Sequence, residues 1–429
     1  MGMIETATEK DRVVSVHPWP ADQGDGYARD ARREEFDRLV ISSDCELLCS
    51  IPVLLRRAFA GMLLGKGQVA SIAEKVREHR AAVVFVDHQL SPVQQRNLEK
   101  AWDAKVVDRT GLILEIFAAR AYTREGVLQV ELASLKYQIS RLVRSWTHLE
   151  RQRGGFGFMG GPGERQIELD RRMIRTRIKS VEKDLAQVRR MRATQRAGRR
   201  RKEIPTVALV GYTNAGKSTL FNRLTEADVR AADQLFATLD PTLRMVELKE
   251  GGRLMLSDTV GFVQDLPHEL VDAFRATLEE VVEADLILHV RDASDPEVVM
   301  HGEVVNDTLA QLGLDHAEAP PVVEVWNKAD LVPRVASHIV PEVAGSRVAL
   351  SALDGRGVPE LLDLLRKWLE LDMEEMELAI PASDGRMLAY CHSHGHVLAQ
   401  SMDGETVRVT VRMSAKDTVP LEPFKREGA

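Results

Sequence analysis

Cysteine is scarce in this chain of 429 residues, which contains only Cys45, Cys49 and Cys391. An odd number of cysteines without C-x-x-C spacing predicts neither a disulfide framework nor a zinc site, so a reducing cytoplasm is the compartment that fits. The sequence shows no charged and then apolar leader, and no uncharged run approaches the roughly 20 residues of a membrane-spanning helix. We therefore expect a cytoplasmic protein without a membrane span, while peripheral contact with a membrane stays open.

A net positive charge is also lacking, but positively charged residues are concentrated in one segment. The net charge is −7, which by itself does not indicate a protein that binds polyanions. Between Arg120 and Lys202, however, 22 lysines and arginines stand against 8 acidic residues, a local charge of +14 that leaves −21 for the rest of the chain. A basic arm on an acidic body is typical of nucleic-acid binding. A solvated helical surface without a partner is the alternative that charge alone leaves open.

The strongest motif runs from Gly211 to Ser218 and reads GYTNAGKS, which matches the phosphate-binding pattern G-x-x-x-x-G-K-[ST]. Its glycines let backbone N–H groups turn onto phosphates at a helix N-terminus. An expected strand at 206–210 precedes the loop and an amphipathic helix follows it, which is the context that a P-loop requires. We expect Lys217 to reach the β- and γ-phosphates and Ser218 to bind Mg²⁺. The predicted phosphate-binding residues are Gly211, Tyr212, Thr213, Asn214, Ala215, Gly216, Lys217, Ser218 and Thr219.

Two further segments are predicted to contact the γ-phosphate and the metal ion. The first, LFATLDPT, ends at Thr242 and offers Thr238 and Thr242 as Mg²⁺ ligands, between which chemistry alone does not choose. The second, DTVG, follows an expected strand; Asp258 would hold Mg²⁺ through water and the N–H of Gly261 would contact the γ-phosphate. The predicted residues of the two segments are Phe236, Ala237, Thr238, Leu239, Asp240, Asp258, Thr259, Val260 and Gly261. Thr238 and Gly261 join Lys217 as the expected catalytic residues.

Base recognition is assigned to two segments that end the expected strands at 322–326 and 347–350. Asp330 of the sequence NKAD would accept two N–H bonds from guanine, whereas adenine would leave the carboxylate unpaired. Because each motif ends an apolar strand, the motifs meet at the ligand crevice of a doubly wound parallel sheet. This predicts a GTPase of the translation-factor-like P-loop class. The predicted base-binding residues are Asn327, Lys328, Ala329, Asp330, Ser351, Ala352 and Leu353.

Two positions bear on the rate of hydrolysis. Phe262 follows Gly261, where many small GTPases carry the glutamine that orients the attacking water. Intrinsic hydrolysis is therefore expected to be slow and to depend on a partner. Asn214 matches an asparagine that, in several GTPases of this class, resembles a ligand for a monovalent cation, so a K⁺ requirement is a hypothesis.

Sequence periodicity divides the chain into five segments. Residues 1–33 are polar and are expected to be a disordered tail. Strands and helices alternate over 34–122, which predicts a small α/β domain. Residues 123–202 predict two long helices with one apolar stripe each, which pair as an antiparallel hairpin. A GTPase domain with a doubly wound, mostly parallel sheet is expected over 203–372, and a small α+β domain over 373–429.

The connection between the two long helices is rich in glycine and carries arginines and phenylalanines. Backbone freedom, positive charge and stacking faces together suit RNA. A mobile spacer would need neither arginine nor aromatic residues at its tip. The candidate RNA contacts are Arg151, Arg153, Phe156, Phe158 and Arg165.

The chain resembles the HflX family of ribosome-associated GTPases over residues 34–429. The segments that carry the resemblance are DRTGLILE from Asp108, TREGVLQVELASLKY from Thr123, GPGERQIELDRR from Gly161, the P-loop, FATLDPT from Phe236 and DTVGF from Asp258. The resemblance implies that GTP governs association with the large ribosomal subunit and its rRNA, reached by the N-terminal domain and the hairpin. It also implies Thr238 as the switch ligand of Mg²⁺. Family members are implicated in splitting stalled or stressed ribosomes.

The interpretation is thus a GTP-hydrolysing factor, expected to be a monomer that is partly ribosome-associated, with GTP or GDP and Mg²⁺ as cofactors. Two alternatives stay open: an assembly or RNA-binding switch in which GTP sets affinity, and an ATP-driven RNA remodeller acting through the N-terminal domain. A tract near the C-terminus has the residue types of a metal site, although the resemblance does not require one. Its members are Cys391, His392, His394 and His396.

The K⁺ hypothesis predicts that GTP hydrolysis depends on the monovalent cation in the buffer. Phosphate release measured in K⁺ should exceed the rate in Na⁺ at equal ionic strength, because only K⁺ would bridge the phosphates at Asn214. Equal rates in the two salts would contradict the hypothesis.

Overall fold

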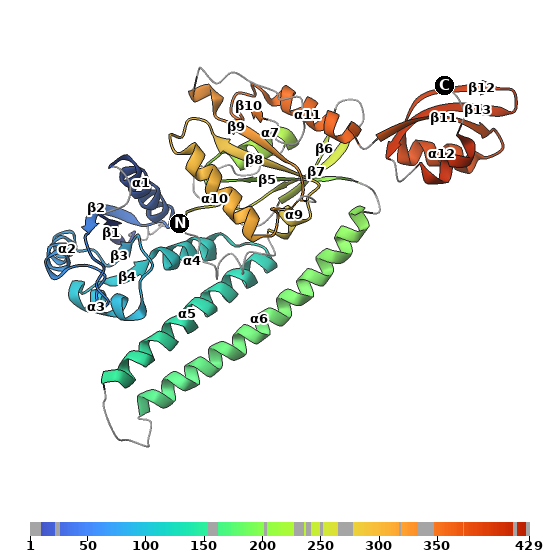
Figure 1. Cartoon of the computed structure of the whole chain (residues 1–429). Coiled ribbons are helices and arrows are strands. Elements are labelled where there is room, and N and C mark those ends of the chain that lie inside the picture. The colour runs from blue at the N-terminus through green and yellow to red at the C-terminus, as the bar shows by residue number, and fades with distance from the viewer. Residues whose placement is uncertain are drawn as a thin grey trace, which may run out of the picture.

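The described residues form four parts that follow one another along the chain (Figure 1). A computed structural model of the chain describes residues 10–21, 26–152, 162–200, 204–226, 236, 242–248, 252–264, 278–316, 319–332, 347–371, 373–414 and 418–425. An α/β domain is followed by two long helices, by a domain with a six-stranded sheet, and by a small domain at the C-terminus. This arrangement confirms the expected fold class.

The N-terminal domain is built on a four-stranded sheet in which every neighbouring pair is parallel. Alternation of side chains gives the sheet two apolar faces: Val13 packs on the side of α1 and α4, and Val14 and Val16 on the side of α2 and α3. The strands in spatial order are β2 (Glu46–Leu55), β1 (Arg12–Pro20), β3 (Val83–Val86) and β4 (Lys105–Asp108). The helices are α1 (Gly26–Ser42), α2 (Lys66–His79), α3 (Pro92–Trp102) and α4 (Arg109–Arg120).

The expectation of a disordered tail over residues 1–33 is wrong for most of that segment. Strand β1 lies inside the sheet between β2 and β3, and α1 covers the sheet from Gly26 onward. The prolines misled the interpretation because they stand at the end of the strand. Pairing with β3 stops at Val16, so Pro18 and Pro20 lie where the strand has a neighbour on one side only, and there proline is tolerated.

The two long helices, α5 (Arg124–Gln152) and α6 (Pro162–Arg200), pack as the expected antiparallel hairpin (Figure 1). Their apolar stripes meet at Leu132, Val181 and Leu185, which are buried. Arg177 adds a two-pronged ion pair to Glu131 at 2.5 and 2.9 Å. The tip residues Arg153, Phe156 and Phe158 lie outside the described residues, as do the side chains of Arg151 and Arg165.

A fully buried carboxylate, Asp108, ties the hairpin to the N-terminal domain. It accepts hydrogen bonds from Tyr137 Oη at 2.6 Å and Arg141 Nη2 at 2.6 Å, both on α5. It also accepts the backbone N–H groups of Gly111 at 2.9 Å and Leu90 at 3.1 Å. Four donors from three segments of the chain converge on one carboxylate, so α5 is fixed relative to the sheet at Tyr137 and Arg141.

The GTPase domain has the expected doubly wound sheet, in which only β6 runs antiparallel to its neighbour. The strands in spatial order are β10 (Arg347–Ala349), β9 (Val322–Asn327), β8 (Leu286–Asp292), β5 (Thr206–Gly211), β7 (Arg253–Asp258) and β6 (Thr242–Glu247). One face packs against α9 (Glu279–Val282) and α10 (Val298–Gln311). The other packs against α7 (Lys217–Thr225) and α11 (Val358–Leu371). A 3-10 turn, η1 (Ala329–Leu331), follows β9.

The C-terminal domain has its own small core and an antiparallel sheet of order β11-β13-β12. Its elements are β11 (Met373–Pro381), α12 (Gly385–His394), β12 (Gly395–Asp403), β13 (Thr406–Ser414) and η2 (Val419–Phe424). His392 contacts Gln400 at 3.2 Å, and His394 stacks on Tyr390. Over the described ranges no cluster of three metal-ligating side chains forms, and none of the helices there is long and apolar enough to cross a membrane.

The placement of β1 predicts that the N-terminal segment is essential for folding. Deletion of residues 1–21 would remove an inner strand and expose both apolar faces of the sheet, so the variant should be insoluble or lack a cooperative thermal transition for this domain. Deletion of residues 1–9 is the matched control and should leave the melting temperature within about 2 °C of the parent. Normal folding of the 1–21 deletion would refute the assignment.

Candidate nucleotide site

The loop between β5 and α7 turns tightly because of its glycines. Gly216, the residue before α7, has a φ of +89°, and a Cβ atom built on it would lie 2.2 Å from Nδ2 of Asn327. Only glycine avoids both the strain and the clash. Asn214 also has a positive φ, 61°, which asparagine adopts more readily than most residues. The loop therefore leads directly into the N-terminus of α7, where P-loop proteins bind phosphate groups.

The buried Lys217 side chain folds back along this loop. Its Nζ donates to the carbonyl oxygens of Gly211 at 3.0 Å and Tyr212 at 2.8 Å. Burial lowers the pKa of Lys217 to about 8, although the charge of Asp258 acts in the opposite direction. A phosphate anion would compensate for the lost hydration, so the site favours a negatively charged ligand.

The predicted metal ligands lie together at the mouth of the loop. Ser218 Oγ donates to Oδ2 of Asp258 at 2.8 Å. A hydroxyl and a carboxylate are the hard oxygen donors that Mg²⁺ prefers, so these residues fit the ion. The third predicted ligand, Thr238, lies outside the described residues with its neighbours Ala237, Leu239 and Asp240.

The segment after β7 lies along the P-loop. Phe262 N donates to Gly211 O at 3.1 Å, and Thr213 N donates to Phe262 O at 2.7 Å. Gly261 is so close to the loop that a Cβ atom built on it would lie 3.0 Å from both Lys217 Nζ and Thr213 Cα. The backbone of Gly261 is thus next to the lysine that reaches the phosphates, as the sequence predicts.

Three predicted residues turn their side chains into the protein. Thr259 Oγ1 donates to Leu209 O at 2.6 Å, and Val260 belongs to the apolar core. Phe236 packs edge-on against Phe117 of α4, with ring centroids 4.7 Å apart. Any contact of Thr259 or Val260 with a nucleotide would therefore be made by the backbone.

The two base-binding segments come together at the ends of β9 and β10. Asn327 bridges them to the P-loop: its Nδ2 donates to Ala215 O at 2.8 Å and its Oδ1 accepts Ala352 N at 2.9 Å. Asp330 Oδ1 is buried and makes no hydrogen bond within the described part of the chain. An unsatisfied carboxylate oxygen at this place fits a ligand with N–H donors, as guanine has.

The neighbouring predicted residues support this arrangement through their backbones. Ser351 is fully buried, and its N–H and carbonyl bond within the turn that ends at Arg356. Ala329 N donates to Leu350 O at 3.1 Å. Leu353 is 73 % exposed at the edge of the site. The structure thus brings together the predicted residues of the P-loop, the segment after β7 and both base-binding segments.

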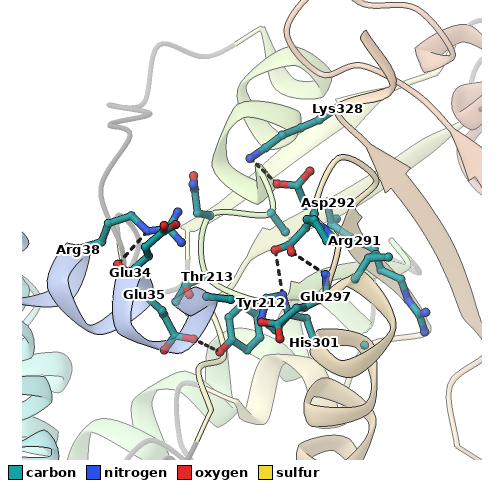
Figure 2. Close-up of a pocket in the computed structure, with 18 of the residues that line it drawn as sticks. Glu34, Glu35, Arg38, Tyr212, Thr213, Arg291, Asp292, Glu297, His301 and Lys328 are labelled. Atoms are coloured by element: carbon teal, nitrogen blue, oxygen red, sulfur yellow. Dashed lines mark hydrogen bonds and ion pairs between the residues drawn. The ribbon is translucent and has the colours of Figure 1, made fainter. Parts of the chain in front are cut away.

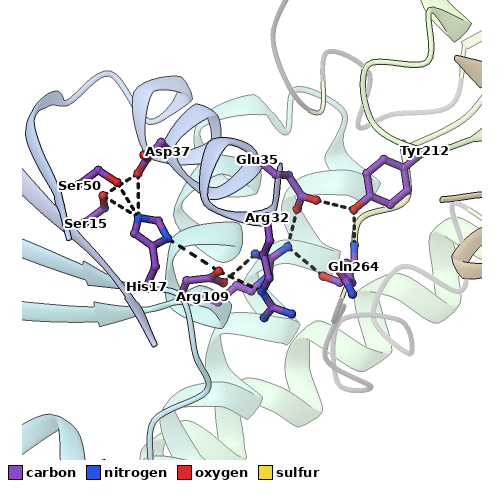
Figure 3. A network of polar contacts seen from close by, with 10 residues as sticks. Ser15, His17, Arg32, Glu35, Asp37, Ser50, Arg109, Tyr212 and Gln264 are labelled. Atoms are coloured by element: carbon purple, nitrogen blue, oxygen red, sulfur yellow. Dashed lines mark hydrogen bonds and ion pairs between the residues drawn. The ribbon is translucent and has the colours of Figure 1, made fainter. Parts of the chain in front are cut away.

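Sequence reasoning missed a group of polar residues that joins this site to the N-terminal domain (Figure 3). We call Glu35, Asp87, Arg109, Tyr212 and Gln264 the interdomain cluster. Arg109 donates to Asp87 at 2.9 Å, to Glu35 at 2.6 Å and to Gln264 O at 3.0 Å. Tyr212 Oη donates to Glu35 at 2.6 Å and accepts Gln264 N–H at 3.0 Å. In the sequence, only the DRTG segment drew attention to a member of this cluster, Arg109. That segment does not indicate which residues Arg109 would contact.

The electrostatics of the interdomain cluster reflect burial offset by opposite charge. Arg109 is 3 % exposed, yet the charges of Glu35 and Asp87 outweigh its desolvation and raise its pKa. Burial favours the neutral form of Asp87, but the charges of Arg109 and Arg32 hold its pKa below the ordinary value. Burial and the charge of Glu35 raise the pKa of Tyr212 well above its usual range, so its hydroxyl remains a donor.

A cavity of about 280 Å³ opens beside the P-loop, between the two domains (Figure 2). Helix α1 lines one side, and Tyr212 to Ala215 line the other together with the end of β8. His301 stacks on the Tyr212 ring at 3.8 Å, and Lys328 forms an ion pair with Asp292 at 2.7 Å. Burial, with the charges of Arg291 and Lys217, lowers the pKa of His289 to about 3. That histidine is therefore neutral at physiological pH.

Comparison with known protein families matches three consecutive parts of the chain. Residues 206–328 match the family described as 50S ribosome-binding GTPase. Residues 30–118 match the GTP-binding GTPase N-terminal family, and residues 120–199 match the GTP-binding GTPase middle region. Together these matches cover the N-terminal domain, most of the hairpin and the core of the GTPase domain.

Curated relatives resemble the chain over most of its length. The protein named GTPase HflX of Magnetococcus marinus is 51 % identical over 402 residues, which are 92 % of this chain and 91 % of the relative. GTPase HflX of Escherichia coli strain K12 is 46 % identical over 389 residues, 90 % of each chain. GTPase HflX of Akkermansia muciniphila is 41 % identical over 403 residues, 91 % of each.

The lowered pKa of Lys217 predicts that nucleotide affinity depends on pH. The phosphate stabilises the charged lysine, so its pKa must rise on binding and the complex must take up a proton. Affinity should be constant below about pH 7 and weaken above pH 8, approaching tenfold per pH unit. Calorimetry at pH 8 in two buffers of different ionisation enthalpy should show uptake of about half a proton.

Lys217→Arg is the matched control for this titration. Arginine stays charged across the range, so its complex, although weaker, should show no proton uptake at pH 8. An affinity of the parent protein that stays constant from pH 7 to 9.5 would contradict the assignment to Lys217.

Proposed function

The chain belongs to the HflX family of GTPases, and we propose that it binds the large ribosomal subunit in its GTP-bound form and splits stalled or stressed ribosomes. It hydrolyses GTP to GDP and phosphate at the site described above. The proposal assigns it to the cytoplasm, as a monomer whose N-terminal domain and hairpin contact rRNA. Support comes from the similarity of residues 206–328 to 50S ribosome-binding GTPases and from the charge of the hairpin.

The observation that carries the proposal is the row of exposed basic residues on α6. The helix has 39 residues, so it is about 58 Å long and can reach deep into a nucleic-acid assembly. Lysines and arginines neutralise backbone phosphates, which supplies most of the affinity for structured RNA. The exposed basic residues described on this helix are Arg172, Arg175, Arg177, Lys179, Lys183 and Arg190, of which Arg177 pairs with Glu131.

The roles of the site residues follow from their positions. Lys217 would hold the β- and γ-phosphates, the N–H of Gly261 would contact the γ-phosphate, and Asp330 would select guanine. Ser218 and, through water, Asp258 would hold Mg²⁺, which would neutralise charge on the phosphates. Thr238, which lies outside the described residues, is proposed as a further ligand on the resemblance to the family alone. K⁺ at Asn214 remains part of the proposal. The residue directly after Gly261 is Phe262 and not glutamine. The group that orients the attacking water for fast hydrolysis would therefore become available on ribosome binding.

Sedimentation of purified 70S ribosomes tests the proposal. With a non-hydrolysable GTP analogue the ribosomes should separate into subunits and the protein should sediment with the large subunit only. With GDP, or with Lys217→Ala, the 70S peak should persist. Stable binding without splitting would replace the proposal by an assembly or sensing switch, and no binding at all would refute the ribosome as partner.

A charge-reversal pair tests the role of the hairpin. Arg172→Glu with Arg175→Glu should weaken binding to the large subunit by about tenfold or more and lower its salt dependence. Lys367→Glu with Arg386→Glu changes the net charge equally at exposed sites outside the hairpin and should leave affinity within about twofold. Equal losses in the two variants would mean that net charge, and not the hairpin, determines binding.

A further inference from the structure

The interdomain cluster contacts both the P-loop and the segment after β7. Both backbone polar groups of Gln264 are hydrogen-bonded. Tyr212 Oη accepts its N–H at 3.0 Å, and Arg109 donates to its carbonyl oxygen at 3.0 Å. Tyr212 belongs to the P-loop, and Gln264 comes three residues after Gly261. Arg109 and Glu35 belong to the N-terminal domain. The domain interface therefore fixes the position of the segment that senses the γ-phosphate.

The segment between Gly261 and Gln264 has little freedom to move independently of these contacts. Phe262 is bonded to the P-loop through its N–H at 3.1 Å and through its carbonyl at 2.7 Å. Gly261 lies so close to Lys217 that a Cβ atom built on it would be 3.0 Å from Nζ. A Cβ atom built on Gly261 would be equally close to Thr213 Cα, so the segment is packed on the P-loop where a γ-phosphate bound by Lys217 and the Gly261 amide would enter, and we expect its arrival to displace the segment.

We propose that Glu35 and Arg109 are positioning residues that hold the Gly261–Gln264 segment against the P-loop, and that GTP, unlike GDP, must break this hold. They act on the nucleotide through Tyr212 and Gln264 and do not touch it. The proposal concerns the isolated protein and requires no ribosome, so it stands or falls independently of the function proposed above.

The chemistry of the cluster makes such a release feasible. When Gln264 moves, Arg109 loses one carbonyl but keeps the ion pair with Asp87 at 2.9 Å, so its charge is never left unpaired in the interior. Glu35 likewise keeps Arg109 at 2.6 Å. The conformation with Gln264 bound and the one with Gln264 released thus differ only in hydrogen bonds to neutral groups, and each such bond contributes modestly to stability.

Thermodynamic linkage gives the consequence for affinity. The free energy needed to release Gln264 reduces the binding free energy of GTP but not that of GDP. By reciprocity, bound GTP weakens the docking of α1 on the GTPase domain by the same free energy. The N-terminal domain would thereby discriminate between the two nucleotides. It would also change its own contacts with the GTPase domain when GTP replaces GDP.

Glu35→Gln in the full-length protein tests the proposal, because it removes the carboxylate charge that holds Tyr212 and Arg109 at the interface and lies outside the P-loop. Dissociation constants should be measured for GDP and for a non-hydrolysable GTP analogue. We expect the analogue to bind threefold or more tightly than to the parent protein, with GDP affinity within twofold. Equal changes for both nucleotides, or no change for either, would overturn the proposal.

Tyr137→Phe is the matched control. Like Glu35→Gln, it disturbs a hydroxyl–carboxylate hydrogen bond of 2.6 Å, here to Asp108, in the N-terminal part of the chain, away from the P-loop. It should lower thermal stability without altering the ratio of the two dissociation constants. A ratio that shifts as much in this control as in Glu35→Gln would mean that general destabilisation, and not the interdomain cluster, is responsible.

Hydrogen exchange provides a second readout that does not depend on a variant. Amides of α1 in the parent protein should exchange faster with the GTP analogue than with GDP, because α1 loses support when Gln264 is released. Arg109→Lys keeps a charge beside Asp87, but its single ammonium nitrogen cannot span Asp87, Glu35 and Gln264 as the two Nη atoms of arginine do, so fast exchange should appear with GDP as well. Identical exchange of α1 with both nucleotides in the parent protein would also overturn the proposal.

Discussion

The buried guanidinium of Arg109 is the constraint on which the relation between the two main domains depends. Its carboxylate partners come from α1 and from the end of β3, and its third partner is a carbonyl of the GTPase domain. Removing one partner of such a buried pair typically costs about 3–5 kcal/mol, because the remaining charge has no water to solvate it. The two domains are therefore committed to one relative arrangement unless another set of partners is available.

The surroundings of this charge strengthen its interactions. A single apolar cluster runs from Phe36 and Phe117 of the N-terminal domain to Phe236 and Phe262 beside the nucleotide site. Water is largely excluded there, and in such a medium hydrogen bonds and ion pairs are stronger than at the surface. The same exclusion makes any unsatisfied group costly. The polar contacts at this interface thus determine which relative position the two domains adopt, while the apolar contacts supply most of the stability of the interface.

What the sequence could predict was local. The P-loop, the DTVG segment and Asp330 were found because each motif follows an apolar strand, and the sheet brings strand ends together. The interdomain cluster could not be predicted, because Glu35, Arg109 and Gln264 are far apart in the chain and no spacing rule pairs them. Strand β1 was missed because its buried valines are few and prolines end it.

The continuous apolar cluster across the two domains has a consequence for how the chain denatures. The N-terminal and GTPase domains share one core, so they should lose structure as a single cooperative unit, whereas the C-terminal domain has a separate core around Met376 and Val411. A GTPase domain produced alone would lose the packing of Phe236 against Phe117 and would be more prone to aggregate. The independence of the C-terminal domain makes the stretch before β11 the natural place to divide the chain.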